Sequence, residues 1–532
     1  MQGKENIKKA FDGLSLSDYY TLFCFVLLIG GVLYSTFIFT LALVAIVIRI
    51  LFIGSIKDKL TTIKQNKILL ICLIGLYILN IIGLIWTDNL PKGLTELNHK
   101  LPLLIIPLFI AVISPLKRNV YYIAFAFYLL MLTFGIIYGF INYIIHPYTE
   151  SRVLIPFARH ISFAFHLSFA SAAMIILSYK NRRMAKYFIP ITVLFLSYIF
   201  IASLASGVIT VTVLAVLSSF ILLFRLRSKY ACIISIMVLA GCLSAGYWFY
   251  RQYCNYFVPK EDFAVMSVSK TSNGNDYRKT YDRFIENGNY VNKYCCPEEV
   301  NAAWKNRTGL DITDYCIGKE GNVHYHYYDI IYRYLNSKGL KKDAQGVNSL
   351  TQKDIENIKQ GCSNIVYTDK FSLKPRLYQT FYEFERYFRT KEVENMSLIQ
   401  RIVWTENTLK VIKDRPVKGT GTGAAKDCMD RYLKISHPEI QMPINDPHNQ
   451  FLYTTANFGL IGLAVLLIFL LYPMFRLHLG NNPYFTVFFI TALCWMFAES
   501  CLERYDGMCF VSTLMSFFCF NQIADKNKTP FQ

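Results

Sequence analysis

The sequence predicts an all-α polytopic membrane protein with about twelve transmembrane helices and one large, mainly helical loop domain on the outer side. Of its 532 residues, 54% are hydrophobic and only 17% are charged, whereas soluble domains carry about 25% charged residues. Uncharged runs of 27 and 38 residues occupy positions 119–145 and 187–224. About 18 apolar residues suffice for a transmembrane helix. Charges gather instead in one central segment, residues 251–450.

This uneven distribution excludes three classes of protein. A soluble enzyme and a disordered chain do not carry apolar runs of such length. The net charge of +19 does not indicate a DNA-binding protein, because the basic residues of a membrane protein gather in its cytoplasmic loops. We therefore expect membrane lipids as partners and no nucleic acid.

The apolar runs divide the chain into three parts. Residues 1–250 form a membrane domain with spans 1–9, residues 251–450 form the outer loop domain, and residues 451–532 hold spans 10–12 and a cytoplasmic tail. The predicted spans lie at roughly 19–34, 36–53, 68–86, 101–115, 119–145, 160–178, 186–203, 206–224, 230–250, 451–475, 483–500 and 507–523.

The positive charges orient these spans. With the amino terminus in the cytoplasm, the cytoplasmic pieces hold 19 Lys and Arg residues, and the short outer pieces hold five. This asymmetry follows the rule that cytoplasmic loops are rich in Lys and Arg. Both termini are therefore expected in the cytoplasm, with residues 251–450 facing outward.

Six cysteines fall in the outer segment, namely Cys254, Cys295, Cys296, Cys316, Cys362 and Cys428. An oxidising compartment permits disulfides among them. The alternative is that they are buried as small hydrophobic side chains. A zinc site built from Cys295, Cys296, His324 and His326 would lack regular ligand spacing, so we predict no metal site and no cofactor.

A helix is predicted from Lys374 to Lys413, where apolar residues recur every three to four positions. Asp414, Arg415 and Pro416 end it, and a Gly-Thr-Gly-Thr-Gly run follows at 419–423. This run follows a helix rather than a strand and precedes no Lys-Ser/Thr pair, so it fits neither a dinucleotide-binding fingerprint nor a P-loop. It can still form a turn whose backbone approaches a ligand.

The outer segment closes with a histidine at the mouth of a predicted span. His448 and Asn449 are followed by Leu452, and then by Gly459 and Gly462 inside the span. A histidine that is both wet and rigidly held accepts protons near neutral pH, as a general base must. The alternative is a histidine that only caps or anchors the helix at the interface.

Taken together, these motifs resemble the O-antigen ligase and polymerase family of bacterial envelope glycosyltransferases. Arg401-Ile-Val-Trp404 followed by Pro416 and the 419–423 turn is similar to the family's Arg-containing helix, proline and Gly-x-Gly turn. The His448-Asn449 pair is similar to its His-Asn signature, and many spans with one large outer loop match its architecture. The family's Ser-Arg-x-Gly stretch lacks its arginine here, at 203–207.

The resemblance implies a metal-independent glycosyltransferase in the bacterial inner (plasma) membrane, with a periplasmic loop domain. The donor would be an undecaprenyl-diphosphate-linked glycan, and the acceptor would be lipid A-core or another glycan, as in lipopolysaccharide biosynthesis. O-antigen ligase is the favoured activity. O-antigen polymerase and protein O-oligosaccharyltransferase of the same family remain alternatives.

The chemistry assigns roles to particular side chains. Arginine binds phosphate through two parallel hydrogen bonds and keeps its proton, so Arg401 is expected at the donor diphosphate. His448 is expected to accept the proton of the acceptor hydroxyl. Further candidates for substrate binding are Arg152, Arg159, His160, Arg415, Gly421, Asn449, Glu499 and Glu503. For the two glutamates, a structural ion pair is the alternative.

A polysaccharide transporter or flippase is the alternative from another class. Transporters commonly contain two halves of similar design and broken, polar helices at the membrane midplane. Here the predicted spans divide nine and three around the outer domain, and midplane charges are missing. A noncatalytic envelope scaffold would not need the arginine and histidine motifs.

Reporter fusions test the predicted topology. We expect fusions after Ser55, Ser178 and Arg227 to report the cytoplasm and a fusion at Lys341 to report the outer compartment, because of the 19-to-5 asymmetry of basic residues. A cytoplasmic signal at Lys341 would contradict the span count.

Overall fold

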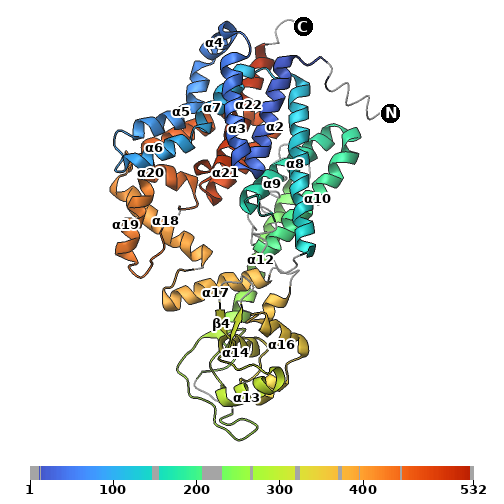
Figure 1. Cartoon of the computed structure of the whole chain (residues 1–532), viewed down its shortest axis with the longest axis vertical. Coiled ribbons are helices and arrows are strands. Elements are labelled where there is room, and N and C mark those ends of the chain that lie inside the picture. Colours follow the sequence, from blue (N-terminus) through green and yellow to red (C-terminus); the bar gives the residue numbers. More distant parts are fainter. Residues whose placement is uncertain are drawn as a thin grey trace.

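The computed structural model describes residues 11, 13–145, 155–206, 231–263, 268–317, 324–369, 374–394, 396–443 and 446–527. The molecule is elongated, with long helices bundled at one end and a smaller domain at the other (Figure 1). Helix α2 begins and helix α22 ends at the far end of the bundle, away from the smaller domain.

The first part of the chain forms ten described helices. They are α2 (Leu16–Tyr34), α3 (Thr36–Phe52), α4 (Ile56–Gln65), α5 (Lys67–Gly83), α6 (Leu90–His99), α7 (Pro102–Ile113), α8 (Arg118–Ile145), α9 (His160–Lys180), α10 (Arg182–Ser206) and α12 (Ala231–Phe257). Serine hydroxyls cap several of them: Ser15 forms a capping box on α2, and Ser35 both ends α2 and caps α3.

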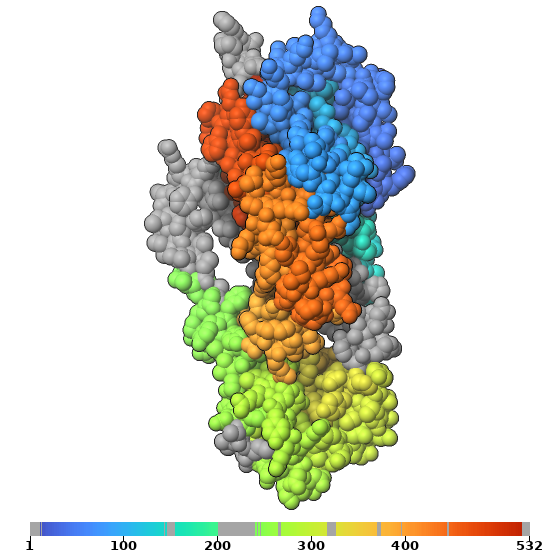
Figure 2. Space-filling view, turned by 90° about the vertical axis from the view of Figure 1, so that its left-hand side faces the viewer, coloured from blue at the N-terminus to red at the C-terminus, as the bar shows by residue number. Residues whose placement is uncertain are grey.

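The last three long helices pack among the first ones. They are α20 (Gln450–Arg476), α21 (Pro483–Ala498) and α22 (Tyr505–Asn527), joined by the short turns η3 (Leu479–Asn481) and η4 (Cys501–Glu503). One apolar core contains residues from both ends of the chain, among them Leu73, Phe109, Leu466, Phe488 and Met515. The contact is visible from the side, where the orange and red parts of the chain lie against the blue part (Figure 2).

The smaller domain, which we call the outer domain after its predicted position, has its own core. It contains α13 (Pro297–Thr308), α14 (Tyr327–Ser337), α15 (Ala344–Asn348), α16 (Gln352–Lys359), the turn η2 (Ile365–Thr368), and two antiparallel hairpins, β1–β2 (Ile285–Glu286, Asn289–Tyr290) and β3–β4 (Tyr315–Ile317, His324–His326). Trp304, Ile331 and Tyr334 are buried at its centre. Helix α17 (Lys374–Thr390) lies between this domain and the bundle (Figure 1).

The outer cysteines contribute to packing rather than to crosslinks. None of the six forms a disulfide within the described chain, and five of them are buried, all except Cys254. Cys295, Cys316 and Cys362 belong to the core of the outer domain. In the structure these thiols therefore follow the alternative of small buried hydrophobic side chains.

The structure confirms a predominantly helical protein with several helices long and apolar enough to span a membrane. Within the described ranges, five segments are long and apolar enough to cross a membrane: Leu16–Tyr34, Leu90–Ile113, Arg118–Asn142, His160–Lys180 and Gln450–Arg476. A sixth is possible if α3 and α4, which are bent by 100°, form one broken span. The number twelve stays a prediction, and the predicted span at 206–224 falls almost entirely outside the described residues.

Two further helices connect the outer domain to the bundle. Helix α18 (Ser397–Asp414) and helix α19 (Ala425–Ser436) pack against the start of α20, burying Val403, Met429 and Tyr453 in one cluster. The predicted helix over 374–413 is thus two helices, α17 and α18, and the second ends just before Arg415 and Pro416.

The glycine run between α18 and α19 lies against other backbone segments. Gly419, Gly421 and Gly423 all have positive φ, and a Cβ at Gly421 would lie 2.5 Å from the Cα of Thr87. A Cβ at Gly423 would lie 2.7 Å from the backbone nitrogen of Gly93. Only glycine combines this backbone conformation with such close approach. The turn therefore fixes α18 and α19 against the link between α5 and α6.

We expect Gly421→Ala to lower the melting temperature of the purified protein, because the added Cβ meets backbone atoms and the residue must keep a φ of 88°. The conformational strain alone costs roughly 1–2 kcal/mol. Gly309→Ala is the matched control, because Gly309 has a φ of 74° but open space around it. Thermal unfolding should show a clearly larger loss for Gly421→Ala, and equal losses would contradict the packing role.

Candidate functional site

Helix α18 presents Arg401 and Trp404 on the same side, because residues three apart lie one turn along a helix. Both side chains extend toward the ends of the last membrane helices. The Arg401 guanidinium donates from Nη1 to the carbonyl oxygen of Ala498 (2.8 Å) and from Nη2 to Oε1 of Glu499 (2.6 Å). Arg401 thereby connects the outer segment to the end of α21.

His448 is held by its backbone as well as by its ring. Its φ is +50°, a region that few residues other than glycine occupy. Its amide donates to Oδ1 of Asp446 (2.6 Å), and the same oxygen accepts from the hydroxyl of Ser500 (3.0 Å). The next residue, Asn449, caps α20 by accepting from the amide of Leu452 (3.0 Å). The imidazole therefore projects from a fixed turn.

Two contacts fix the imidazole ring. Its Nδ1 lies 2.8 Å from Oε2 of Glu499. Its plane stacks on the indole of Trp404, with 5.6 Å between ring centroids and 19° between planes. A carboxylate can only accept, so Nδ1 carries the hydrogen and Nε2 keeps its lone pair in the neutral ring. The histidine side chain is 17% exposed, and the glutamate is 2% exposed.

Glu499 is a buried carboxylate surrounded by cations. Arg401 contacts one oxygen, and the other is near both His448 and the guanidinium of Arg504, 3.7 Å away. Burial alone would raise the pKa of Glu499. The hydrogen bond from His448 and its electrostatic attraction, together with the positive charges of Arg401 and Arg504, outweigh burial and lower the pKa. The carboxylate is thus ionised at neutral pH.

Glu499 and Glu503 face different partners. The sequence places them one helical turn apart, but α21 ends at Ala498, and Glu499 is extended, with φ −151° and ψ 155°. Glu503 instead forms a buried ion pair with Lys100 (2.9 Å) and accepts from Nε2 of Gln450 (3.2 Å). For Glu503 this is the structural ion pair that the sequence left open.

The remaining predicted residues that the structure describes have other contacts. Arg415 forms an ion pair with Asp88 (2.7 Å), and Gly421 belongs to the packed turn described above. Arg159 directly precedes α9, which begins at His160, and it lines a separate cavity. Arg152 lies outside the described residues. Roles in substrate binding for these four residues and His160 stay predictions.

Sequence reasoning missed Asp446, Ser500 and the cationic neighbour Arg504. An Asp-Pro-His string is a usable signal for Asp446, since aspartate often accepts hydrogen bonds from amides two residues later. Ser500 and Arg504 carried no comparable local pattern, because their partners are 54 and 5 residues away. The described residues contain no group of three or more His, Cys, Asp and Glu that could hold a metal ion.

The fold and the site define a helical membrane protein with an Arg–Glu–His cluster between an outer helix and the last helices of the bundle. Residues 363–467 match the family of O-antigen ligases. The matched segment contains α18, the glycine turn, His448 and the first part of α20. The match confirms the resemblance seen in the sequence, over this segment of the chain. No curated protein matches the chain.

We expect Glu499→Gln to melt at a lower temperature than the native protein at neutral pH, because it leaves Arg401 and Arg504 without their shared counter-ion. The lowered pKa means that the native carboxylate stabilises the fold above its unfolded pKa of about 4.3, and that this stability is lost as pH falls through the lower folded pKa. The melting difference should therefore shrink in acid.

Thermal melts of purified protein from pH 7 to pH 3 at constant ionic strength measure this difference. Glu356→Gln is the control, because Glu356 is exposed on α16. A melting difference for Glu499→Gln that stays constant across this pH range would contradict the ionised cluster.

Proposed function

We propose that this protein transfers a glycan from an undecaprenyl-diphosphate-linked donor to lipid A-core, as an O-antigen ligase of the bacterial inner membrane. In this proposal both termini are cytoplasmic, the large loop is periplasmic, and the reaction takes place at the outer face of the membrane. The single observation that carries the proposal is the hydrogen bond between Nδ1 of His448 and the buried carboxylate of Glu499.

That hydrogen bond prepares His448 to act as a general base. With Nδ1–H directed to Glu499, Nε2 is free to take the proton of the acceptor hydroxyl as its oxygen attacks the anomeric carbon. The bond between that carbon and the diphosphate oxygen breaks, and the diphosphate leaves with the electron pair. Glu499 stabilises the imidazolium that forms, because it already lies 2.8 Å from the ring.

The two arginines beside Glu499 supply positive charge for the leaving group. Arg401 and Arg504 are about one-third exposed, so each guanidinium can bind phosphate oxygens while its other side contacts Glu499. Charge-assisted bonds of this kind strengthen as negative charge develops on the leaving diphosphate. We propose a metal-independent reaction on this basis, because the guanidinium groups supply the positive charge that a divalent cation would otherwise provide.

An O-antigen polymerase would use the same base and the same arginines, because only the acceptor differs. Protein O-oligosaccharyltransferase chemistry would also share them. Variants of His448 and Arg401 therefore test the chemistry, and the identity of the product distinguishes these activities.

The test is complementation of a deletion strain, with lipopolysaccharide resolved on gels. We expect the deletion to remove all attached polymer while lipid-linked long chains accumulate. The transfer rate of His448→Ala should be lower than that of the native protein by about two to four orders of magnitude, the range for a positioned base. Arg401→Lys should also fail, because an ammonium group cannot reproduce the guanidinium fork.

His437→Ala is the matched control, because His437 lies in the same outer segment and pairs with Glu439 rather than with the cluster. All variants must be present in the membrane at native levels. Single capped repeats in the deletion strain would indicate a polymerase instead. Full transfer by His448→Ala would remove His448 from the mechanism.

A further inference from the structure

A polar cavity lies beside Tyr505 and Asp506, a few residues after Glu499 in the chain. Its volume is about 190 Å³, and it is lined by residues of α2, α9 and the start of α22, together with the segment before α9. This is smaller than the roughly 300–1,000 Å³ of pockets for drug-sized ligands. The cavity therefore suits one small group, such as one sugar ring or one phosphate.

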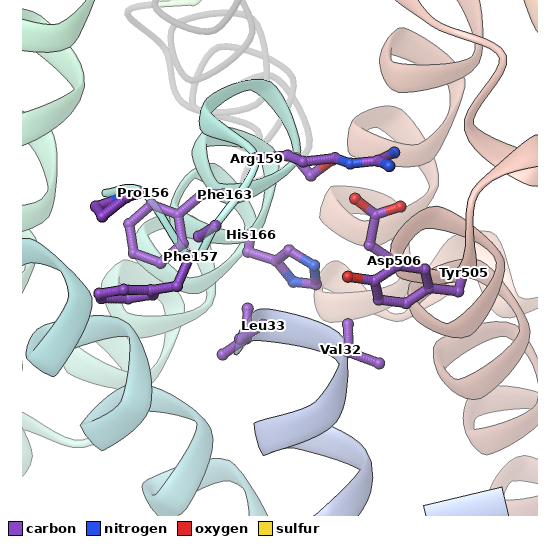
Figure 3. A pocket seen from close by; sticks show the side chains of 11 residues that line it. Val32, Leu33, Pro156, Phe157, Arg159, Phe163, His166, Tyr505 and Asp506 are labelled. Carbon is purple, nitrogen blue, oxygen red and sulfur yellow. The ribbon is translucent and has the colours of Figure 1, made fainter. Parts of the chain in front are cut away.

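The ring of His166 projects into this cavity from α9 (Figure 3). The residue is only 3% exposed, yet its Nε2 finds no hydrogen-bond partner among the described residues. The hydroxyl of Tyr128 donates to the carbonyl oxygen of His166 (3.2 Å) and lies 2.9 Å from Nδ1. The tautomer with its hydrogen on Nδ1 satisfies both contacts at once, because Nδ1–H donates to the hydroxyl while the hydroxyl donates to the carbonyl oxygen. In this tautomer Nε2 is an acceptor that faces the cavity.

Charges of both signs face the same space. Asp506 is 4% exposed, and its carboxylate accepts from the amide of Gly507 (2.9 Å) while its oxygens extend toward the guanidinium of Arg159 across the cavity (Figure 3). Within the described residues Arg159 forms no ion pair. A phosphate would have to enter beside a buried carboxylate of the same sign. Neutral hydroxyl groups can instead donate to Asp506 and accept from Arg159.

The apolar walls fit the same kind of ligand. The rings of Phe157, Phe163 and Tyr505 line the cavity, and Figure 3 shows them around His166. Flat aromatic faces pack against the C–H faces of a sugar, and a few convergent polar groups then fix its orientation.

We propose that this cavity is a sugar-binding subsite for one ring of a glycan substrate. Asp506 and Nε2 of His166 accept hydrogen bonds from ring hydroxyls, Arg159 and the hydroxyl of Ser162 complete the polar contacts, and the aromatic rings hold the apolar face. The subsite rests on the proposed function, since it takes a glycan as substrate. Arg504, which contacts Glu499, directly precedes Tyr505 and Asp506, so one short segment carries both sites.

Initial rates with the full-length protein in lipid nanodiscs test the subsite. The donor is lipid-linked glycan and the acceptor is unmodified glycolipid, both extracted from the deletion strain. We expect Asp506→Asn and Ser162→Ala each to raise KM for one of these two substrates. The increase should be roughly 10- to 100-fold for Asp506→Asn, which removes a charged hydrogen-bond partner. In both variants kcat should stay within about threefold of the native value. Ser168→Ala is the matched control, because Ser168 is equally buried on α9 but bonds to Ala164.

The substrate whose KM rises identifies the source of the ring, donor or acceptor. Sugar-free undecaprenyl diphosphate is the phosphate probe, and its inhibition constant should stay unchanged in both variants. An inhibition constant that rises with KM would overturn the proposal in favour of a phosphate site, and unchanged KM values in both variants would overturn it outright. If Asp506→Asn does not fold, the KM values of Ser162→Ala and Arg159→Gln test the subsite instead. A native protein that transfers no glycan would overturn the proposed function, and this subsite with it.

Discussion

The carboxylate of Glu499 is the contact on which the candidate site depends. It is almost fully buried, and an ionised carboxylate is costly to bury unless cations and hydrogen-bond donors surround it. Here the compensation comes from three separate parts of the chain: Arg401 on α18, His448 before α20, and Arg504 after η4. Each of these side chains is oriented because the carboxylate lies between them, and the carboxylate is stable there because all three are present.

Backbone packing brings these parts within reach of one another. Gly419 and Gly459 lie where a Cβ would meet the backbone of α20 and of the segment after α18, respectively. The amide of Gly421 donates to the carbonyl oxygen of Asn457 (2.8 Å). The start of α20, and with it His448, is therefore held at backbone distance from the end of α18. A larger residue at Gly419 or Gly459 would have to push these backbone segments apart.

The sequence predicts the elements of this arrangement better than their contacts. Apolar runs locate most of the long helices, because hydrophobic length is a local property. The end of α18 just before Arg415 and Pro416 and the position of His448 at the mouth of α20 are also local signals. The pairing of His448 with Glu499 spans 51 residues, and that of Arg401 with Glu499 spans 98. No periodicity or motif reports such distances. The extended backbone at Glu499, which turns it away from Glu503, was likewise invisible in an otherwise helical pattern.

The position of Glu499 also limits how this domain can be exchanged between proteins. The segment that matches the O-antigen ligase family ends at residue 467, and it includes His448 and Arg401 but neither Glu499 nor Arg504. A chimera that grafts only this segment onto another scaffold would receive a histidine without the carboxylate that sets its tautomer. The segment that would have to be exchanged as a whole is therefore longer than the segment that matches the family. It extends through α21 and η4 to the first turn of α22, and recombination within that stretch would separate residues that function together.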